Sequence, residues 1–296
     1  MIDLDALAAL RAVATHGSVI AAATATGYTP SAVSQQVKRL ERQTGVPLLE
    51  RVGRGVMLTS QGLHLVTAGD RVLADLEELE ADLQASTGRV GGRVRLAVFS
   101  TAVRGLVAPV VRRLRDAHPD LDLVIDEREP WDAVDLVAGG QAEIGIVHRW
   151  GGVELAVPDH VTSQRLARDV ADLVVPHDHP LAARRRATPR DLVDVEWIAT
   201  PEGTICRQWL RRMYDGTGAT PRIAHVSAEF DSHLALVAAG LGVALVPRLG
   251  RAPLGPDVVA VAVRDPEPIR LIDALHRRTM SASPAVRAVL DAFAGG

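Results

Sequence analysis

The 296-residue chain has a single cysteine, Cys206, and aromatic residues make up only 3% of it. One cysteine excludes an internal disulfide and, by itself, a thiolate metal site. No apolar run approaches the roughly 18–20 residues that span a bilayer. The start of the chain, MIDLD, has two acids where a secretory signal needs positive charge. These absences predict a cytoplasmic protein that does not enter a membrane.

The chain also lacks the short motifs of common enzymes. It contains no GxSxG, no phosphate-binding GxxxxGK and no GxGxxG. His177 and His179 lie close together, but no third ligand follows at metal spacing, and Cys206 has no second cysteine to resolve an oxidised thiol. We therefore predict no catalytic activity, no metal site and no cofactor other than a non-covalently bound small molecule.

What the sequence does have is an uneven charge. The net charge is −3, yet residues 29–54 carry five basic side chains and two acidic ones. Residues 59–88 reverse this balance, with one arginine against six acids. A basic head, an acidic stalk and a neutral body indicate three regions with different roles, which we predict at 1–58, 59–87 and 88–296.

Residues 1–58 have the pattern of three short helices and a hairpin. Ser18 and Thr29 are suited to cap the second and third helices, which end at Gly27 and Gly45. Helices of this size with a tight break between them have the proportions of a helix-turn-helix. Two short extended pieces then surround the tip Gly53-Arg54-Gly55, as in a winged hairpin.

The third helix divides into an apolar face and a polar one. Short hydroxyl and amide side chains near a helix N-terminus reach base edges in the major groove, while cations one or two turns later meet phosphates. The alternative is a small helical domain whose serines only cap helices and whose arginines are only solvated, but the ordered combination favours DNA binding. The candidate DNA-contacting residues are Thr29, Pro30, Ser31, Ser34, Gln35, Lys38, Arg39, Arg51 and Arg54.

Residues 59–87 predict a long helix with the seam of a coiled coil. The apolar positions follow spacings of four and three, with acids on the other faces. This seam favours self-association over packing against the protein's own body. Its members are Leu65, Gly69, Val72, Leu76, Leu79 and Leu83.

Residues 88–296 alternate strands and helices, which predicts an α/β fold with a mainly parallel sheet covered on both faces. A strand at 94–99 precedes a helix at 106–118, and residues 162–175 form one strand or two. Ligands of open α/β sheets bind beyond the carboxyl ends of strands. The polar residues there are suited to a small anion, with Phe230 as an apolar wall: Ser100, Thr101, His148, Arg149, Thr200 and Thr204. The alternative is that the hydroxyls cap helices and Arg149 is a surface cation.

Three stretches carry a family resemblance over residues 1–62: HGSVIAAA, TPSAVSQQVKRLE and TGVPLLERVGRGVMLTSQG. In order and spacing they resemble the winged helix-turn-helix of LysR-type transcriptional regulators. Val19 stands where that family usually has phenylalanine, and Pro30 stands where a glutamine often contacts DNA. Base reading here is therefore expected to rest more on four other residues: Thr29, Ser31, Ser34 and Gln35.

The resemblance extends to the whole chain and implies its assembly. Residues 59–87 would be the linker helix that pairs two heads in a homodimer, and a tetramer would form as a dimer of dimers. The body resembles two Rossmann-like lobes of a periplasmic-binding-protein fold, the first at about 93–165 plus 267–296 and the second at about 166–266. The loops that hold the effector in this family coincide with those chosen above.

Together these observations predict a transcriptional regulator that binds operator DNA and senses a small carboxylate or amino acid between its lobes. RNA polymerase is a further possible partner. An enzyme or a transport binding protein built on the body alone is the rival class, but it lacks a nucleophile–base set and an export signal. A constitutive DNA-bending protein without an effector would be favoured if side chains filled the cleft.

Overall fold

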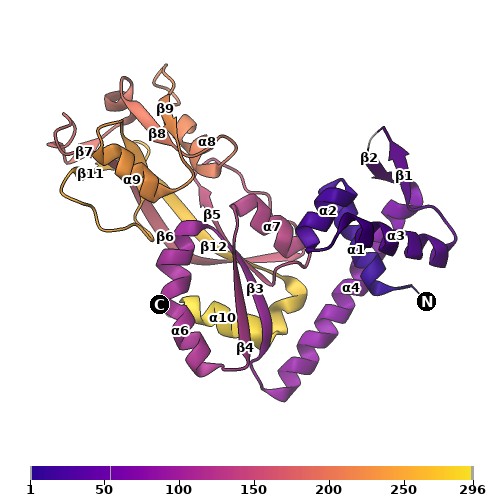
Figure 1. Cartoon of the computed structure of the whole chain (residues 1–296). Coiled ribbons are helices and arrows are strands. Elements are labelled where there is room, and N and C mark those ends of the chain that lie inside the picture. The colour runs from indigo at the N-terminus through magenta and orange to yellow at the C-terminus, as the bar shows by residue number, and fades with distance from the viewer. Residues whose placement is uncertain (1, 54, 295–296) are drawn as a thin grey trace.

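A small helical head, one long helix and a two-lobed body follow one another along the chain in the computed structural model, which describes residues 2–53 and 55–294 (Figure 1). No single helix among these residues is long and apolar enough to cross a membrane. The helices Leu4–His16 and Val19–Thr26 reach that length and composition only together, and the angle between them is 114°.

The head contains the predicted helices and hairpin. These are α1 (Leu4–His16), α2 (Val19–Thr26), α3 (Pro30–Thr44), β1 (Leu49–Val52) and β2 (Gly55–Leu58). The Ser18 hydroxyl accepts the N–H of Ala21 at the start of α2, as expected of an N-cap. The two strands pair antiparallel, with Val52 opposite Gly55, so the winged hairpin is confirmed.

Helix α4 (Ser60–Thr87) begins at the cap Thr59 and connects the head to the body. Its first turns pack on the head, where a Cβ on Gly69 would come within 2.6 Å of the Leu7 side chain. Further along, Ala81 is buried against the body. The predicted seam is therefore divided, because Leu65 and Gly69 are covered by the protein's own head while Val72, Leu76, Leu79 and Leu83 are exposed.

An eight-stranded mixed sheet organises the body in the order β4-β3-β5-β12-β6-β11-β7, with β10 also paired to β6. The first lobe contains β3 (Gly92–Val98), α5 (Ser100–Ala102), the π-helical turn η1 (Val103–Val107), α6 (Ala108–Ala117), β4 (Leu121–Glu127), α7 (Pro130–Ala138), β5 (Ile144–Trp150), β12 (Ile269–Arg277), the 3-10 turn η3 (Arg278–Ala282) and α10 (Pro284–Ala294). Helices α6 and α10 cover one face of its strands, and α7 covers the other.

The second lobe repeats this arrangement on a smaller scale. It contains β7 (Arg186–Ala187), the 3-10 turn η2 (Pro189–Leu192), β8 (Glu196–Ala199), α8 (Ile205–Arg212), β9 (Arg222–Val226), α9 (Phe230–Ala238), β10 (Ala244–Pro247) and β11 (Val258–Val263). Strands β8 and β9 pair parallel, and Trp197 forms a bridge to Val243 that brings them to the edge of the main sheet. Helices α8 and α9 pack on opposite faces.

One long strand, β6 (Val161–Pro176), joins the lobes. Its first part, up to Val170, pairs with β12, and the part from Ala171 pairs with β10 and β11. The sequence left one strand or two open here, and the structure has one. Strand β6 therefore changes partners between Val170 and Ala171, close to the predicted boundary between the lobes. The boundary itself stays a prediction.

The predicted helix at 106–118 starts earlier than expected. Helix α5 begins at Ser100, directly after β3, and continues through the π-helical turn into α6. The expected start was wrong because the helical spacing of apolar residues is interrupted in the π-helical turn, which contains Gly105. A Cβ there would come within 2.6 Å of the Gly250 nitrogen, so this residue lets the second lobe approach the helix closely.

Candidate DNA-binding face and interlobe cleft

Helix α3 presents a polar face outward from the head. Its apolar residues Val33, Val37 and Leu40 are buried in the head core. Opposite them, Pro30, Ser31, Gln35 and Lys38 are exposed, together with Thr29 ahead of the helix and Arg51 on β1, while Ser34 is half-buried. The amide, hydroxyl and cationic groups therefore share one accessible surface, as reading of a DNA duplex requires.

Two of the candidate DNA-contacting residues, Thr29 and Arg39, also have partners inside the head. The Thr29 hydroxyl accepts the N–H of Ala32 at 3.2 Å and so caps α3, although its own proton stays available as a donor. Arg39 lies 2.7 Å from a carboxylate oxygen of Asp3, and this contact lowers the pKa of Asp3. Arg54, the predicted tip of the hairpin, lies outside the described residues.

A buried arginine is the centre of a polar cluster on the side of the first lobe that faces the second, where the predicted cleft would lie. Arg270 is 1% exposed and donates from Nη2 to the Thr101 hydroxyl at 2.8 Å and from Nε to Asp169 at 2.7 Å. Its guanidinium lies 5.2 Å from the centre of the Phe99 ring. The edge-on partner of that ring is His148, at 4.7 Å between ring centres. Burial lowers the pKa of His148 well below its ordinary value and the charge of Arg270 lowers it further, so the imidazole is neutral near pH 7.

The facing wall comes from the second lobe. The hydroxyls of Thr200 and Thr204 lie 2.8 Å apart, and Thr204 caps α8 by accepting the N–H of Arg207. Phe230 starts α9 and is buried, with its ring 5.2 Å from that of His233. Thr200, Cys206 and Phe230 line a cavity of about 20 Å³, which is room for little more than one water molecule.

Several carboxylates surround Glu129, close to where the two lobes meet. Loss of hydration raises the pKa of Glu129, just ahead of α7, and the carboxylates of Asp132, Glu127 and Glu229 raise it further. Glu229 belongs to the second lobe, directly before Phe230, and its carboxylate lies 3.8 Å from Arg104 of the first lobe while it also adds to the negative charge around Glu129. A bound cationic group would relieve this repulsion.

The structure does not bring Arg149 to the other predicted cleft residues. Successive side chains of a strand point to opposite faces, so His148 points into the cleft wall while Arg149 pairs with Asp273 at 2.7 Å, beside Arg165. Ser100 is half-buried at the start of α5. Sequence reasoning missed Arg270 and Asp169, because each lies in a strand that also carries other charged residues, so no local pattern singled them out. No three His, Cys, Asp or Glu side chains of residues 2–53 and 55–294 gather closely enough to hold a metal ion.

Two family descriptions match the chain. The one described as "Bacterial regulatory helix-turn-helix protein, lysR family" matches residues 4–63, and "LysR substrate binding domain" matches residues 87–295. Among relatives, the "Probable hydrogen peroxide-inducible genes activator" of Streptomyces viridosporus is 32% identical over 83% of this chain and 77% of its own length. The "HTH-type transcriptional regulator CbbR" of Xanthobacter flavus is 32% identical over 79% of this chain and 69% of its own length.

Solved structures share the fold over almost the whole chain. A full-length OxyR variant from Pseudomonas aeruginosa superposes with a TM-score of 0.71 at 20% identity, covering 99% of this chain and 98% of that one. Full-length CbnR, solved in complex with its target DNA, superposes with a TM-score of 0.57 at 20% identity, covering 99% of each chain.

Proposed function

Since the chain belongs to the LysR family, whose members are DNA-binding transcriptional regulators with an effector-binding domain and not enzymes, we propose that it reads operator DNA with α3 and the β1–β2 hairpin. The observation that carries this proposal is the exposed polar face of α3, where Gln35 and Lys38 stand clear of the head core. CbnR was solved with its target DNA and has the same fold, which supports the assignment. A protein that acts on the bacterial chromosome works in the cytoplasm.

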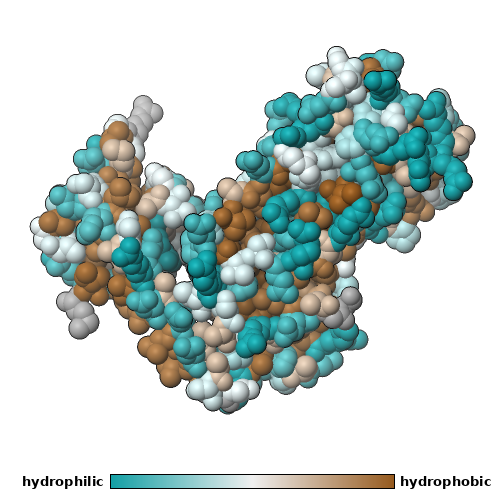
Figure 2. All heavy atoms as spheres, turned by 180° about the vertical axis from the view of Figure 1, so that it is seen from behind, coloured by the Kyte–Doolittle hydropathy of each residue, from teal (hydrophilic) through white to brown (hydrophobic). Residues whose placement is uncertain are grey.

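The exposed stripe of α4 supports self-association. Val72, Leu76, Leu79 and Leu83 are 36–58% exposed, and Figure 2 shows hydrophobic side chains along the outer edge of the long helix. Their spacing of four, three and four residues is that of a coiled-coil seam. A second copy of α4 would cover the stripe and place two heads on one operator, and two such dimers would form the tetramer. RNA polymerase is a further partner that a regulator of this kind would meet on DNA.

The cleft supports a small effector with two opposite charges. The hydroxyls of Thr101, Thr200 and Thr204 and the guanidinium of Arg270 suit a carboxylate, and Glu129 at the edge suits an ammonium group. An amino acid carries both groups, so it fits better than a plain carboxylate. Entry would require the lobes to move apart, because the enclosed cavity has a volume of only about 20 Å³.

Quantitative binding to DNA tests the reading head. Operator fragments selected from a random pool should be footprinted, and the affinities of the variants should be measured on specific and random duplexes over a range of salt concentrations. Gln35→Ala should lose roughly 1–3 kcal/mol on the specific site only. Lys38→Ala should weaken binding to both duplexes and flatten the salt dependence. Thr24→Ala, on the exposed side of α2, is the matched control. Equal loss on both duplexes for Gln35→Ala would contradict base reading.

The small cavity favours a second candidate, a regulator that binds DNA without a small effector. Thermal unfolding of the full chain with a panel of amino acids and carboxylates separates the two. A true effector at 100 times its dissociation constant adds about 2.7 kcal/mol to stability, and Thr101→Val should remove that gain. A panel without any stabilising compound would favour the second candidate.

A further inference from the structure

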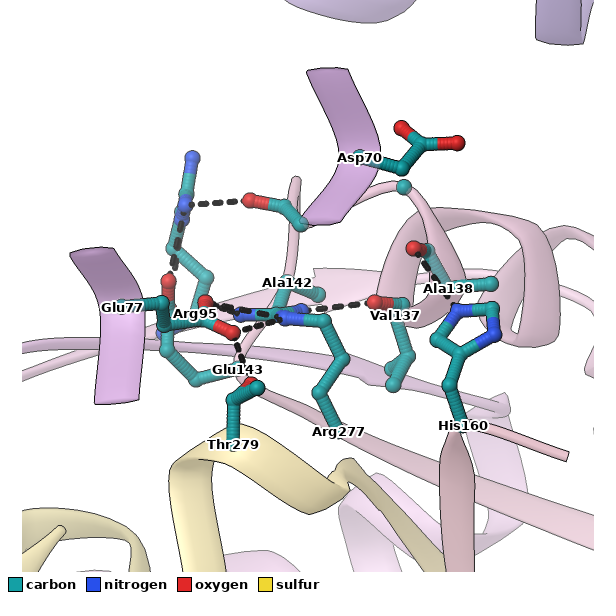
Figure 3. Close-up of polar contacts among 12 residues, drawn as sticks. Asp70, Glu77, Arg95, Val137, Ala138, Ala142, Glu143, His160, Arg277 and Thr279 are labelled. Atoms are coloured by element: carbon teal, nitrogen blue, oxygen red, sulfur yellow. Dashed lines mark hydrogen bonds and ion pairs between the residues drawn. The ribbon is translucent and has the colours of Figure 1, made fainter. Parts of the chain in front are cut away.

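The linker helix α4 is clamped to the body by one buried arginine. Arg277, the last residue of β12, is 7% exposed. Its Nη1 donates to the carbonyl oxygens of Val137 at 2.6 Å and Ala142 at 2.7 Å, which fixes the guanidinium within the first lobe. Its Nε and Nη2 donate to the carboxylate of Glu77 on α4, at 2.9 and 2.6 Å (Figure 3). The Thr279 hydroxyl donates to the same carboxylate.

The surroundings favour the charged form of Glu77. Burial by itself would raise the pKa of Glu77, but the hydrogen bonds from Arg277 and Thr279 outweigh it and hold the pKa below its ordinary value. A planar guanidinium that engages a carboxylate through two nitrogens fixes orientation as well as distance. Because Arg277 is itself held by two backbone carbonyls, Glu77 is bound to a rigid point of the lobe rather than to a mobile surface side chain.

The head makes a second contact with the same lobe. Arg11 on α1 donates from Nη2 to the carbonyl oxygen of Gly139, directly after α7, at 2.7 Å. Gly140 follows with a φ of +74°, and a Cβ there would come within 3.2 Å of Arg11 Nη2. Figure 1 shows the head beside α7. The head and the linker helix are thus both attached to the first lobe, through α1 and through α4.

Two elements run from these contacts to the cleft between the lobes. Strand β12 carries Arg270 in the cleft wall and Arg277 at the clamp, seven residues or about 23 Å apart along the strand. Helix α7 begins after Glu129 at the cleft edge and ends just before Gly139. A single strand and a single helix therefore connect the region of Arg270 and Glu129 to the head contacts.

We propose that the Glu77–Arg277 clamp and the Arg11–Gly139 bond form an intrachain latch that holds the head and linker on the first lobe in one orientation. In this scheme β12 and α7 couple the state of the cleft to the latch. A ligand changes an equilibrium only if it distinguishes the two states, and docked and released heads provide such a pair. That release alters DNA binding rests on the proposed function, whereas the latch itself does not.

Intrachain distances in the full-length protein, measured without DNA, test the latch. Spin labels on Thr24→Cys in α2 and Asp116→Cys in α6, in a Cys206→Ser background, report the position of the head on the lobe. Dilution with unlabelled protein removes distances between copies. One narrow distance is expected in the parent. Glu77→Gln and Arg11→Gln should each lower the ratio of docked to released heads about tenfold, the effect of losing a charge-assisted hydrogen bond. Glu78→Gln, which removes the adjacent exposed charge, should leave the distribution unchanged.

The outcomes separate the parts of the proposal. Distributions for Glu77→Gln and Arg11→Gln that match that of Glu78→Gln would overturn the latch. Thr101→Val, which deletes the hydroxyl that accepts the Arg270 hydrogen bond, should shift the ratio as well, and an unchanged ratio would overturn the coupling to the cleft. If the parent shows a latched head but binds no duplex DNA, the proposed function fails while the latch stands.

Discussion

The thiol of Cys206 experiences two opposing influences. It lies in the first turn of α8, where the helix dipole favours a thiolate. Although the residue as a whole is half-buried, enclosure of the thiol between the lobes raises its pKa to about 12, against a smaller opposite effect of Arg270. At neutral pH the thiol is therefore protonated, and the thiolate is the form that reacts. We therefore expect Cys206 to be unreactive in the folded protein, although one relative is described as an activator of peroxide-inducible genes.

Labelling with a thiol-specific disulfide reagent at pH 7 checks this expectation. The folded chain should react at least 100-fold more slowly than the same chain in urea, because only the unfolded chain exposes a thiol of ordinary pKa. Cys206→Ser should not react in either state. Native labelling as fast as that in urea would show that the thiol is an accessible and activated group.

The cleft residues illustrate which contacts a sequence can predict. Thr101, His148, Thr200 and Phe230 were predicted as cleft residues because each comes at or after the end of an expected strand, and the carboxyl ends of parallel strands meet at one edge. Arg149 was predicted beside them, but strand alternation turns its side chain away from His148 and toward Asp273. Arg270 lies far along the chain and reaches the cleft only because β12 pairs with β5, with Arg270 opposite Trp150. That register depends on tertiary packing, which local patterns do not contain.

Helix α4 has two different faces. One face is used within the chain, where Gly69 approaches Leu7 and Glu77 reaches Arg277. The other carries the exposed stripe Val72, Leu76, Leu79 and Leu83. The heptad spacing predicted a single seam from Leu65 to Leu83, but the start of that seam is covered by the head. The period of the helix was therefore predictable, whereas the partner of each part of it was not.

Two charges in the exposed stripe should prevent dimer formation. Leu76→Asp combined with Leu79→Asp removes two leucines that would each contribute roughly 1.5–3 kcal/mol when buried by a second copy, and it places like charges opposite each other. Sedimentation should show the dimer dissociating, while the melting temperature of the body changes little. Leu63→Asp, at a leucine of similar exposure on the same helix outside the stripe, is the control. Unchanged dimerisation of the double variant would assign the dimer contact to another surface.

The head, the long helix and the body, which differ in composition and charge, are in contact in the folded chain. Composition and charge distinguished head, stalk and body, and the fold confirms a head, a long helix and two lobes. The placement of the head on the first lobe was not predictable, because the clamp joins Glu77 to Arg277, 200 positions apart. Neither residue belongs to a motif, and the acidic surface of α4 by itself predicts only solvation.

The geometry of a dimer joined through α4 makes a prediction about the operator. Two heads related by a two-fold axis read half-sites on one face of the duplex, one helical turn or a multiple of it apart. Inserting about 5 bp between the half-sites turns the second one to the far face, so the affinity should fall roughly 100-fold as the contribution of the second head is lost. Inserting about 10 bp restores the face and should cost much less. Gel-shift titrations of the original operator, the operator with about 5 bp inserted and the operator with about 10 bp inserted measure this difference in affinity. Equal losses for both insertions would mean that the heads move independently of the linker helix, whereas recovery at 10 bp requires that α4 holds them in a fixed relation.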